Sequence, residues 1–192
     1  MAPRSSPSRK AYDRSRDVSA LSVDALDRWN PNMRAANVQA SQGATVINVY
    51  DVIGYDYWSG GGITSDWFAD QIKGKGDLVI NINSPGGDFF EGLTIHNMLR
   101  QHAAKKTINI VGLSASAASL ISAAGIGDGN QVRIAPAAYV MIHNVWGLVV
   151  GNKNDMRDAA QVFDKFDQGA RVIYSGQTGK SDAEIAELMD EE

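Results

Sequence analysis

From residue 44 onward, strand patterns alternate with helix patterns, and this alternation constrains the fold of the 192-residue chain more than any other feature. Short apolar runs such as residues 77–82 (DLVINI) are separated by stretches that repeat apolar residues every three or four positions. Strand–helix units in series imply a mainly parallel sheet with right-handed crossovers. The sequence therefore predicts one α/β domain over residues 44–192.

The predicted elements follow from periodicity and capping signals. Strands are expected at 44–53, 77–82, 107–112, 131–134 and 138–143. Helices are expected from an N-cap at Thr64 to about Lys73, at 88–102, 117–124 and 152–174, and from a capping box at Ser181 onward. The helix at 152–174 is long and amphipathic. Because reactive groups collect at the carboxyl ends of parallel strands, the residues that follow these strands are the first candidates for a site.

Composition limits the function classes. Residues 1–43 are expected to form a disordered or weakly structured basic arm, since residues 1–19 hold five basic and two acidic side chains with several prolines and serines. The net charge of −4 argues against a dedicated nucleic-acid binder. No cysteine is present, so disulfides and thiolate chemistry are excluded. No apolar run suits a membrane span or a signal peptide, so neither membrane attachment nor export is expected.

A glycine turn follows the second predicted strand. Its sequence is Asn83-Ser84-Pro85-Gly86-Gly87. A Pro-Gly pair is often only a turn, whereas a second glycine that opens a helix also allows close backbone approach and an exposed N–H. A phosphate cradle would need a Gly-x-Gly-x-x-Gly or a Gly-Lys-Ser/Thr pattern, and neither accompanies this turn. We therefore interpret Gly87 as a donor to an oxyanion.

Four serines follow the third predicted strand: Ser114, Ser116, Ser119 and Ser122. The last two fall inside a helix, where a serine hydroxyl more often bonds back to the carbonyl four residues earlier. Ser116 falls where strand becomes helix, so its hydroxyl can project into a cleft, and the N–H of Ala117 can face charge that develops there. The alternative is a small-residue helix packed on the sheet, with serines as polar spacers.

Of three histidines, His143 is the candidate base. It ends an apolar strand, and histidine ionises closer to neutral pH than other side chains. We interpret His96 and His102 as surface or packing residues. No second ligand stands at metal spacing from His143, so we expect no metal and no cofactor. Three acidic residues end the chain, Asp190, Glu191 and Glu192, and composition alone does not choose among them as a partner for the histidine.

Together, the segments 83–87, 112–125, 140–143 and 178–181 resemble the ClpP-type serine peptidases. Residues 88–92 (DFFEG), 143–146 (HNVW) and 189–192 (MDEE) are similar to the head maturation (prohead) proteases of tailed phages and prophages. The likeness covers about residues 44–192. It implies the ClpP/crotonase-like fold, with a chain that in relatives continues beyond residue 192.

The resemblance also implies roles. Ser116 matches the family nucleophile, His143 the base, and Gly87 and Ala117 the oxyanion donors. Ungapped counting places the family's aspartate on Glu192, with Asp190 as the alternative acid. It further implies a homo-oligomer, a heptameric ring or double ring with internal sites, in the host cytoplasm or the prohead.

The resulting hypothesis is a serine endopeptidase, with or without an assisting ATPase, that cleaves capsid, scaffold or portal proteins during phage head maturation. The main alternative is a ring protein of this fold that has lost turnover and has a structural or scaffolding role. A crotonase-type acyl-CoA enzyme shares the oxyanion turn but gives no reason for a Ser116–His143 pair.

Overall fold

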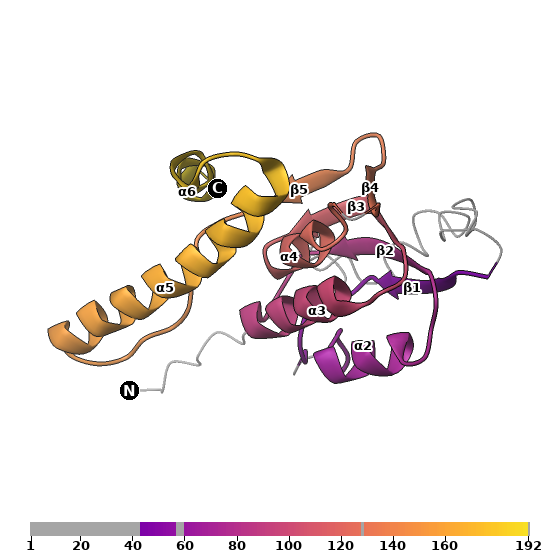
Figure 1. Ribbon diagram of the computed structural model, residues 1–192. Coiled ribbons are helices and arrows are strands. Elements are labelled where there is room, and N and C mark those ends of the chain that lie inside the picture. Colours follow the sequence, from indigo (N-terminus) through magenta and orange to yellow (C-terminus); the bar gives the residue numbers. More distant parts are fainter. Residues whose placement is uncertain (1–42, 57–59, 128, 192) are drawn as a thin grey trace, which may run out of the picture.

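The computed structural model describes residues 43–56, 60–127 and 129–191, so nearly all of the predicted basic arm lies outside the described residues. Figure 1 shows a sheet with helices on one face. Its strands are β1 (Thr45–Val49), β2 (Leu78–Ser84), β3 (Lys106–Ala115), β4 (Gln131–Ile134) and β5 (Tyr139–Met141). The order is β1-β2-β3-β4, and β5 pairs with the last part of β3 beyond β4. All of these pairings are parallel, which confirms the predicted α/β class.

Among the described residues, five helices accompany the sheet: α2 (Ser65–Ile72), α3 (Phe89–Gln101), α4 (Ala117–Ala123), α5 (Lys153–Thr178) and α6 (Asp182–Glu191). The predicted N-cap of α2 is confirmed, because the Thr64 hydroxyl accepts from the Trp67 N–H at 3.2 Å. Helices α2, α3 and α4 lie over one face of the sheet, whereas α5 projects beyond it (Figure 1). Within the described residues, none of the helices is both long and apolar enough to cross a membrane.

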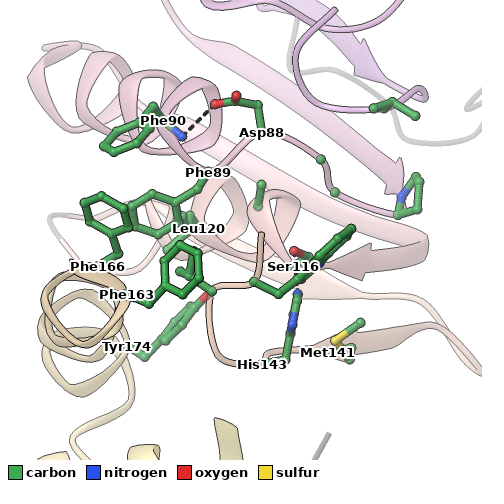
Figure 2. A pocket seen from close by; sticks show the side chains of 18 residues that line it. Asp88, Phe89, Phe90, Ser116, Leu120, Met141, His143, Phe163, Phe166 and Tyr174 are labelled. Carbon is green, nitrogen blue, oxygen red and sulfur yellow. Dashed lines mark hydrogen bonds between the residues drawn. The ribbon is translucent and has the colours of Figure 1, made fainter. Parts of the chain in front are cut away.

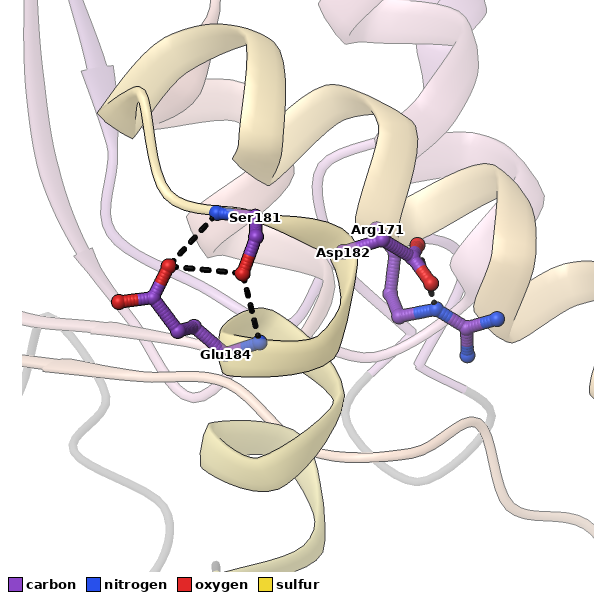
Figure 3. Close-up of polar contacts among 4 residues, drawn as sticks. All are labelled: Arg171, Ser181, Asp182 and Glu184. Carbon is purple, nitrogen blue, oxygen red and sulfur yellow. Dashed lines mark hydrogen bonds and ion pairs between the residues drawn. The ribbon is translucent and has the colours of Figure 1, made fainter.

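The predicted capping box at Ser181 is also present (Figure 3). The Glu184 carboxylate accepts hydrogen bonds from the Ser181 N–H and hydroxyl, both at 2.8 Å, and the Ser181 hydroxyl accepts from the Glu184 N–H. These bonds favour the ionised form, so the pKa of Glu184 lies below its usual value. Beside the box, Arg171 of α5 pairs with Asp182 at 2.9 Å and ties α6 to the long helix.

The core explains the apolar residues of β2. Every residue of β2 is buried, as expected for a strand covered on both faces. On the helical face, Ile80 and Ile82 pack in one cluster with Phe68 of α2 and Ile95 of α3. A second, smaller cluster joins α4 to α5 and α6, and its buried members are Leu120, Ala170, Tyr174, Ile185 and Met189.

An asparagine ladder runs across the first three strands. The Asn81 amide on β2 donates to Asn48 on β1 at 2.9 Å, and the Asn109 amide on β3 donates to Asn81 at 2.9 Å. The three residues share one register position. A slip of any of these strands would break the bonds. The slip is unfavourable because an unpaired amide is costly to bury. The ladder therefore holds the strand ends, and the residues that follow them, at a common edge.

Two predicted strand ends are wrong. Strand β3 was expected to stop at Gly112 but continues to Ala115. It can do so because Gly112 leaves room for Asn83, whose side-chain oxygen accepts from the Leu113 N–H at 3.0 Å; a Cβ at Gly112 would lie 2.4 Å from that oxygen. Strand β1 was expected to reach residue 53 but ends at Val49.

Two further bounds differ from expectation. Strand β5 ends at Met141, two residues before His143, because its partner β3 ends at Ala115, opposite Met141. Helix α5 was expected to end at Tyr174 but reaches Thr178 and ends at Gly179, whose left-handed φ of 73° terminates it. Periodicity predicted both elements, whereas their ends depend on partner strands and caps.

Candidate active site

Ser116 lies at the junction predicted for it, between the end of β3 and the start of α4. Its backbone has φ 52° and ψ −127°, a conformation that residues with a Cβ rarely adopt. Two hydrogen bonds hold it: the Ser116 N–H donates to the Met141 carbonyl at 2.9 Å, and the Ser116 carbonyl accepts from the Ser119 N–H at 2.9 Å. The sharp turn places the Ser116 side chain on the wall of a cavity instead of within the sheet.

His143 reaches this serine from the end of the neighbouring strand. The Ser116 hydroxyl oxygen and His143 Nε2 are 2.7 Å apart. Figure 2 shows the imidazole directed at Ser116 from the segment that follows β5. A contact of this length suits proton transfer between the two groups. The structure therefore brings together the two side chains that the sequence singled out.

The glycine turn after β2 packs against the same junction. A Cβ at Gly86 would lie 2.5 Å from the Ala115 carbonyl oxygen, 2.6 Å from Ser116 Cβ and 2.9 Å from the Ala117 nitrogen. Gly86 has φ 90°, so both its conformation and its surroundings require glycine. The turn was predicted to permit close backbone approach, and here the group it approaches is the Ser116–Ala117 peptide.

The direction of the Gly87 N–H follows from its pairing with Ile53. The Gly86 carbonyl accepts from the Ile53 N–H, and the Asp88 N–H donates to the Ile53 carbonyl, both at 2.8 Å. In a parallel bridge of this kind, the middle residue points its own N–H to the opposite side. The Gly87 N–H therefore faces away from Ile53. Gly87 lines the same cavity as Ser116.

Ala117 supplies a second backbone donor. It is the first residue of α4, so its N–H has no carbonyl one turn earlier to bond. Ala117 and Gly87 both line the cavity that contains Ser116 and His143. The residues expected to hold an oxyanion are thus on the wall of the same cavity as the candidate nucleophile.

The cavity has a volume of about 730 Å³, and much of its wall is aromatic (Figure 2). Phe89 and Phe90 from the start of α3 meet Phe166 of α5, with ring centroids 5.9 Å and 5.1 Å apart. Phe163, Trp146 and Tyr174 also line it. Such a wall favours an apolar side chain beside the serine.

One acidic residue near the end of the chain contacts Asn144, the residue that follows His143. Asp190 accepts a hydrogen bond from the Asn144 side chain at 2.6 Å, and the Asn144 N–H donates to the Met189 carbonyl at 3.3 Å. The end of α6 is therefore attached beside His143. Glu192, the acid that the resemblance indicates, lies outside the described residues.

The structure adds Asp167, and a contact of Ser119 with Tyr174, that local sequence patterns did not reveal. Asp167 of α5 is buried, and its carboxylate accepts from the Val145 N–H at 2.7 Å, which fastens the segment after His143. Ser119 bonds back to a carbonyl three residues earlier, and its hydroxyl also meets Tyr174 at 2.6 Å. A charged residue on the apolar side of an amphipathic helix was the only sequence signal for Asp167.

The other histidines and serines have structural contacts. His96 is buried, its Nδ1 lies 2.8 Å from the Leu120 carbonyl, and burial lowers its pKa, so it links α3 to α4 as a neutral donor. His102 bonds the Gly76 carbonyl at 2.8 Å. Ser114 is fully buried and bonds Ser122.

In the described part of the chain, no group of three histidine, aspartate or glutamate side chains could hold a metal ion.

The fold and these residues define a class: an α/β protein with the geometry of a serine hydrolase site. A family model for Clp protease matches residues 63–192, about two thirds of the chain. The chain belongs to the Clp protease family.

The chain is similar to two known proteins at low sequence identity. The ATP-dependent Clp protease proteolytic subunit of Bacteroides fragilis is 29% identical over 114 residues, which cover 59% of this chain and 54% of that protein. The chain thus spans about half the length of this relative. The solved structure of a point mutant of ClpP1 from Listeria monocytogenes superposes with a TM-score of 0.60 and 22% identity, over 76% of this chain and 79% of that one. At this identity the likeness supports the fold.

Proposed function

We propose that this protein is a serine endopeptidase of the ClpP type. Ser116 attacks the peptide carbonyl while His143 takes the hydroxyl proton, and the N–H groups of Gly87 and Ala117 hold the oxyanion. When the intermediate collapses, His143 gives the proton to the leaving amine. Water then attacks the acyl-enzyme by the same route and releases Ser116. The observation that carries this proposal is the 2.7 Å contact between the Ser116 hydroxyl and His143 Nε2.

The cavity supports a peptide substrate. Its aromatic wall begins beside the serine and offers a place for one large apolar side chain of the substrate. The serine–histidine contact distinguishes this reaction from that of a crotonase-type enzyme, where the oxyanion turn alone would suffice. It also favours a working enzyme over a ring protein that has lost turnover, because a purely structural role does not require this contact.

The substrates and the assembly belong to the same proposal. The similarity of residues 88–92, 143–146 and 189–192 to prohead proteases supports capsid, scaffold or portal proteins as substrates, processed in the bacterial host. Family membership supports a homo-oligomeric, heptameric ring or double ring. The projection of α5 away from the sheet, with Val172 72% exposed, is compatible with contacts between copies.

A fluorophosphonate probe tests the reaction without a known substrate. We expect the purified full-length protein to be phosphonylated at Ser116, with the labelled peptide identified by mass spectrometry. The His143→Ala variant is the control and should react at least about 100-fold more slowly, since the serine loses its base. Labelling at another residue, or none in a protein shown to be folded by circular dichroism, would contradict the proposal.

The third member of the triad is proposed to be Glu192, with Asp190 as the alternative. Removing the charge of a triad acid while keeping its shape lowers turnover by up to about 10⁴-fold. Glu192→Gln should therefore slow phosphonylation of Ser116 much more than Asp190→Asn, whose amide can keep the bond with Asn144. The reverse order would assign the role to Asp190. Wild-type rates in both variants would contradict a triad acid at this end of the chain.

A further inference from the structure

Two hydroxyl groups stand behind Ser116 in a chain of hydrogen bonds. The Tyr174 hydroxyl lies 2.6 Å from the Ser119 hydroxyl, and the Ser119 hydroxyl lies 2.5 Å from the Ser116 carbonyl oxygen. Tyr174 belongs to α5 and Ser119 to the first turn of α4, so the chain connects the long helix to the strained junction. Both residues are buried, at 8% and 2% exposure, so water competes little for these bonds.

The direction of each bond is fixed by the available protons. A carbonyl oxygen can only accept, so Ser119 donates its single hydroxyl proton to Ser116. The Tyr174 hydroxyl must then donate to Ser119. Burial raises the pKa of Tyr174 to about 12, so the phenol keeps this proton throughout the neutral range. The result is a permanent relay in which Tyr174 donates to Ser119 and Ser119 donates to the Ser116 carbonyl.

This relay acts on the peptide that carries an oxyanion donor. The peptide between Ser116 and Ala117 is planar and trans, so its carbonyl and its N–H point in opposite directions. The Ser116 carbonyl accepts from both the Ser119 N–H at 2.9 Å and the Ser119 hydroxyl at 2.5 Å, so it is directed into α4 and the Ala117 N–H points out of the start of the helix. Ser116 and Ala117 both line the cavity. Hydrogen bonds in series also polarise one another, so donation to the carbonyl makes the N–H a stronger donor.

We propose that Tyr174 and Ser119 are positioning residues that orient and polarise the Ser116–Ala117 peptide as an oxyanion donor. The proposal rests on the function proposed above. It assigns a chemical purpose to the contact between α5 and α4, which otherwise would only pack the two helices. Figure 2 shows the Tyr174 ring on the side of the cavity away from the Phe90 ring.

The test measures the rate of phosphonylation of Ser116 by a fluorophosphonate at several concentrations, so that the reaction step is separated from binding. In this reaction Ser116 Oγ bonds phosphorus, fluoride leaves and His143 takes the proton, while the phosphoryl oxygen occupies the place of the oxyanion. Ser119→Ala and Tyr174→Phe should each lower the maximal rate roughly 5- to 20-fold, less than the loss of a whole oxyanion donor. The half-saturating concentration should stay unchanged in Ser119→Ala, because Ser119 is not among the residues that line this cavity.

Three further variants separate positioning from packing. The double variant should react no more slowly than Ser119→Ala, because Tyr174 acts only through Ser119. Ser119→Thr keeps the hydroxyl and should recover most of the rate. Ser122→Ala is the matched control: its hydroxyl makes the same kind of bond, 2.9 Å to the Ser119 carbonyl, but that peptide lies one turn away from the site.

The outcomes discriminate between this inference and the proposed function. A labelled wild-type protein with slower Ser119→Ala and Tyr174→Phe, and with an unchanged Ser122→Ala, supports the relay. Wild-type rates in both variants, or losses that appear only in thermal stability, overturn the relay and leave the peptidase proposal standing. An unlabelled wild-type protein overturns both.

Discussion

Ser116→Ala is expected to reduce hydrolysis of an unfolded protein substrate to the background rate. Without the hydroxyl no acyl-enzyme can form, and loss of a catalytic serine lowers turnover by about 10⁴- to 10⁶-fold in related chemistry. The substitution also removes the 2.7 Å contact through which His143 Nε2 would take the proton. The measurement is release of fluorescence from heavily labelled casein, with protein concentration and oligomeric state matched between variants.

Ser114→Ala provides the control for this prediction. Ser114 lies two residues earlier on β3, is fully buried and bonds the Ser122 hydroxyl at 3.2 Å. Its loss should lower the free energy of unfolding by about 1 kcal/mol and leave the rate of hydrolysis unchanged. A Ser116→Ala variant with wild-type hydrolysis, or loss of hydrolysis in Ser114→Ala alone, would show that Ser116 is not the nucleophile.

Gly86→Ala is expected to have the second largest effect, although residue 86 carries no reacting group. The added Cβ would lie 2.6 Å from Ser116 Cβ and 2.9 Å from the Ala117 nitrogen. These atoms belong to the nucleophile and to an oxyanion donor, so relief of the collision must displace one or both. We expect phosphonylation of Ser116 to slow by at least about 100-fold, the usual cost of a misplaced oxyanion donor.

Gly127→Ala separates the collision from backbone strain. Gly127 has φ 89°, almost the same as the 90° of Gly86, but nothing lies within 4 Å of its ideal Cβ. Both variants should lose about 1 to 2 kcal/mol of stability from the left-handed conformation. Only Gly86→Ala should lose the reaction. Equal phosphonylation rates in the two variants would mean that the turn does not control the geometry of Ser116, and thermal denaturation would report the shared strain.

Part of this architecture could be predicted because its signals are local. The alternation of strand and helix patterns determined a parallel α/β sheet, since the apolar period and the capping residues of each element are read within a few positions. Thr64 and Ser181 were correct for this reason. The place of Ser116 at the end of a strand was local in the same way, and topology then puts it at the edge where other strands end.

Helix and strand ends were less predictable because they depend on distant partners. Whether β3 continues past Gly112 depends on Asn83, which approaches from another strand. The sequence shows the glycine but not the side chain that fills the space beside it. The end of β5 depends likewise on how far β3 offers hydrogen-bonding partners.

The sequence by itself thus determined the class of fold and nominated Ser116, His143, Gly87 and Ala117, which the resemblance to ClpP-type peptidases joined in one site. Only the tertiary structure decided that β5 pairs with the end of β3, which sets His143 Nε2 at 2.7 Å from the serine hydroxyl. It also decided that Tyr174 bonds Ser119 across 55 positions of the chain. The physical reason is that hydrogen bonds of this kind depend on where whole elements pack, and a side chain leaves no periodic trace of a partner so far away.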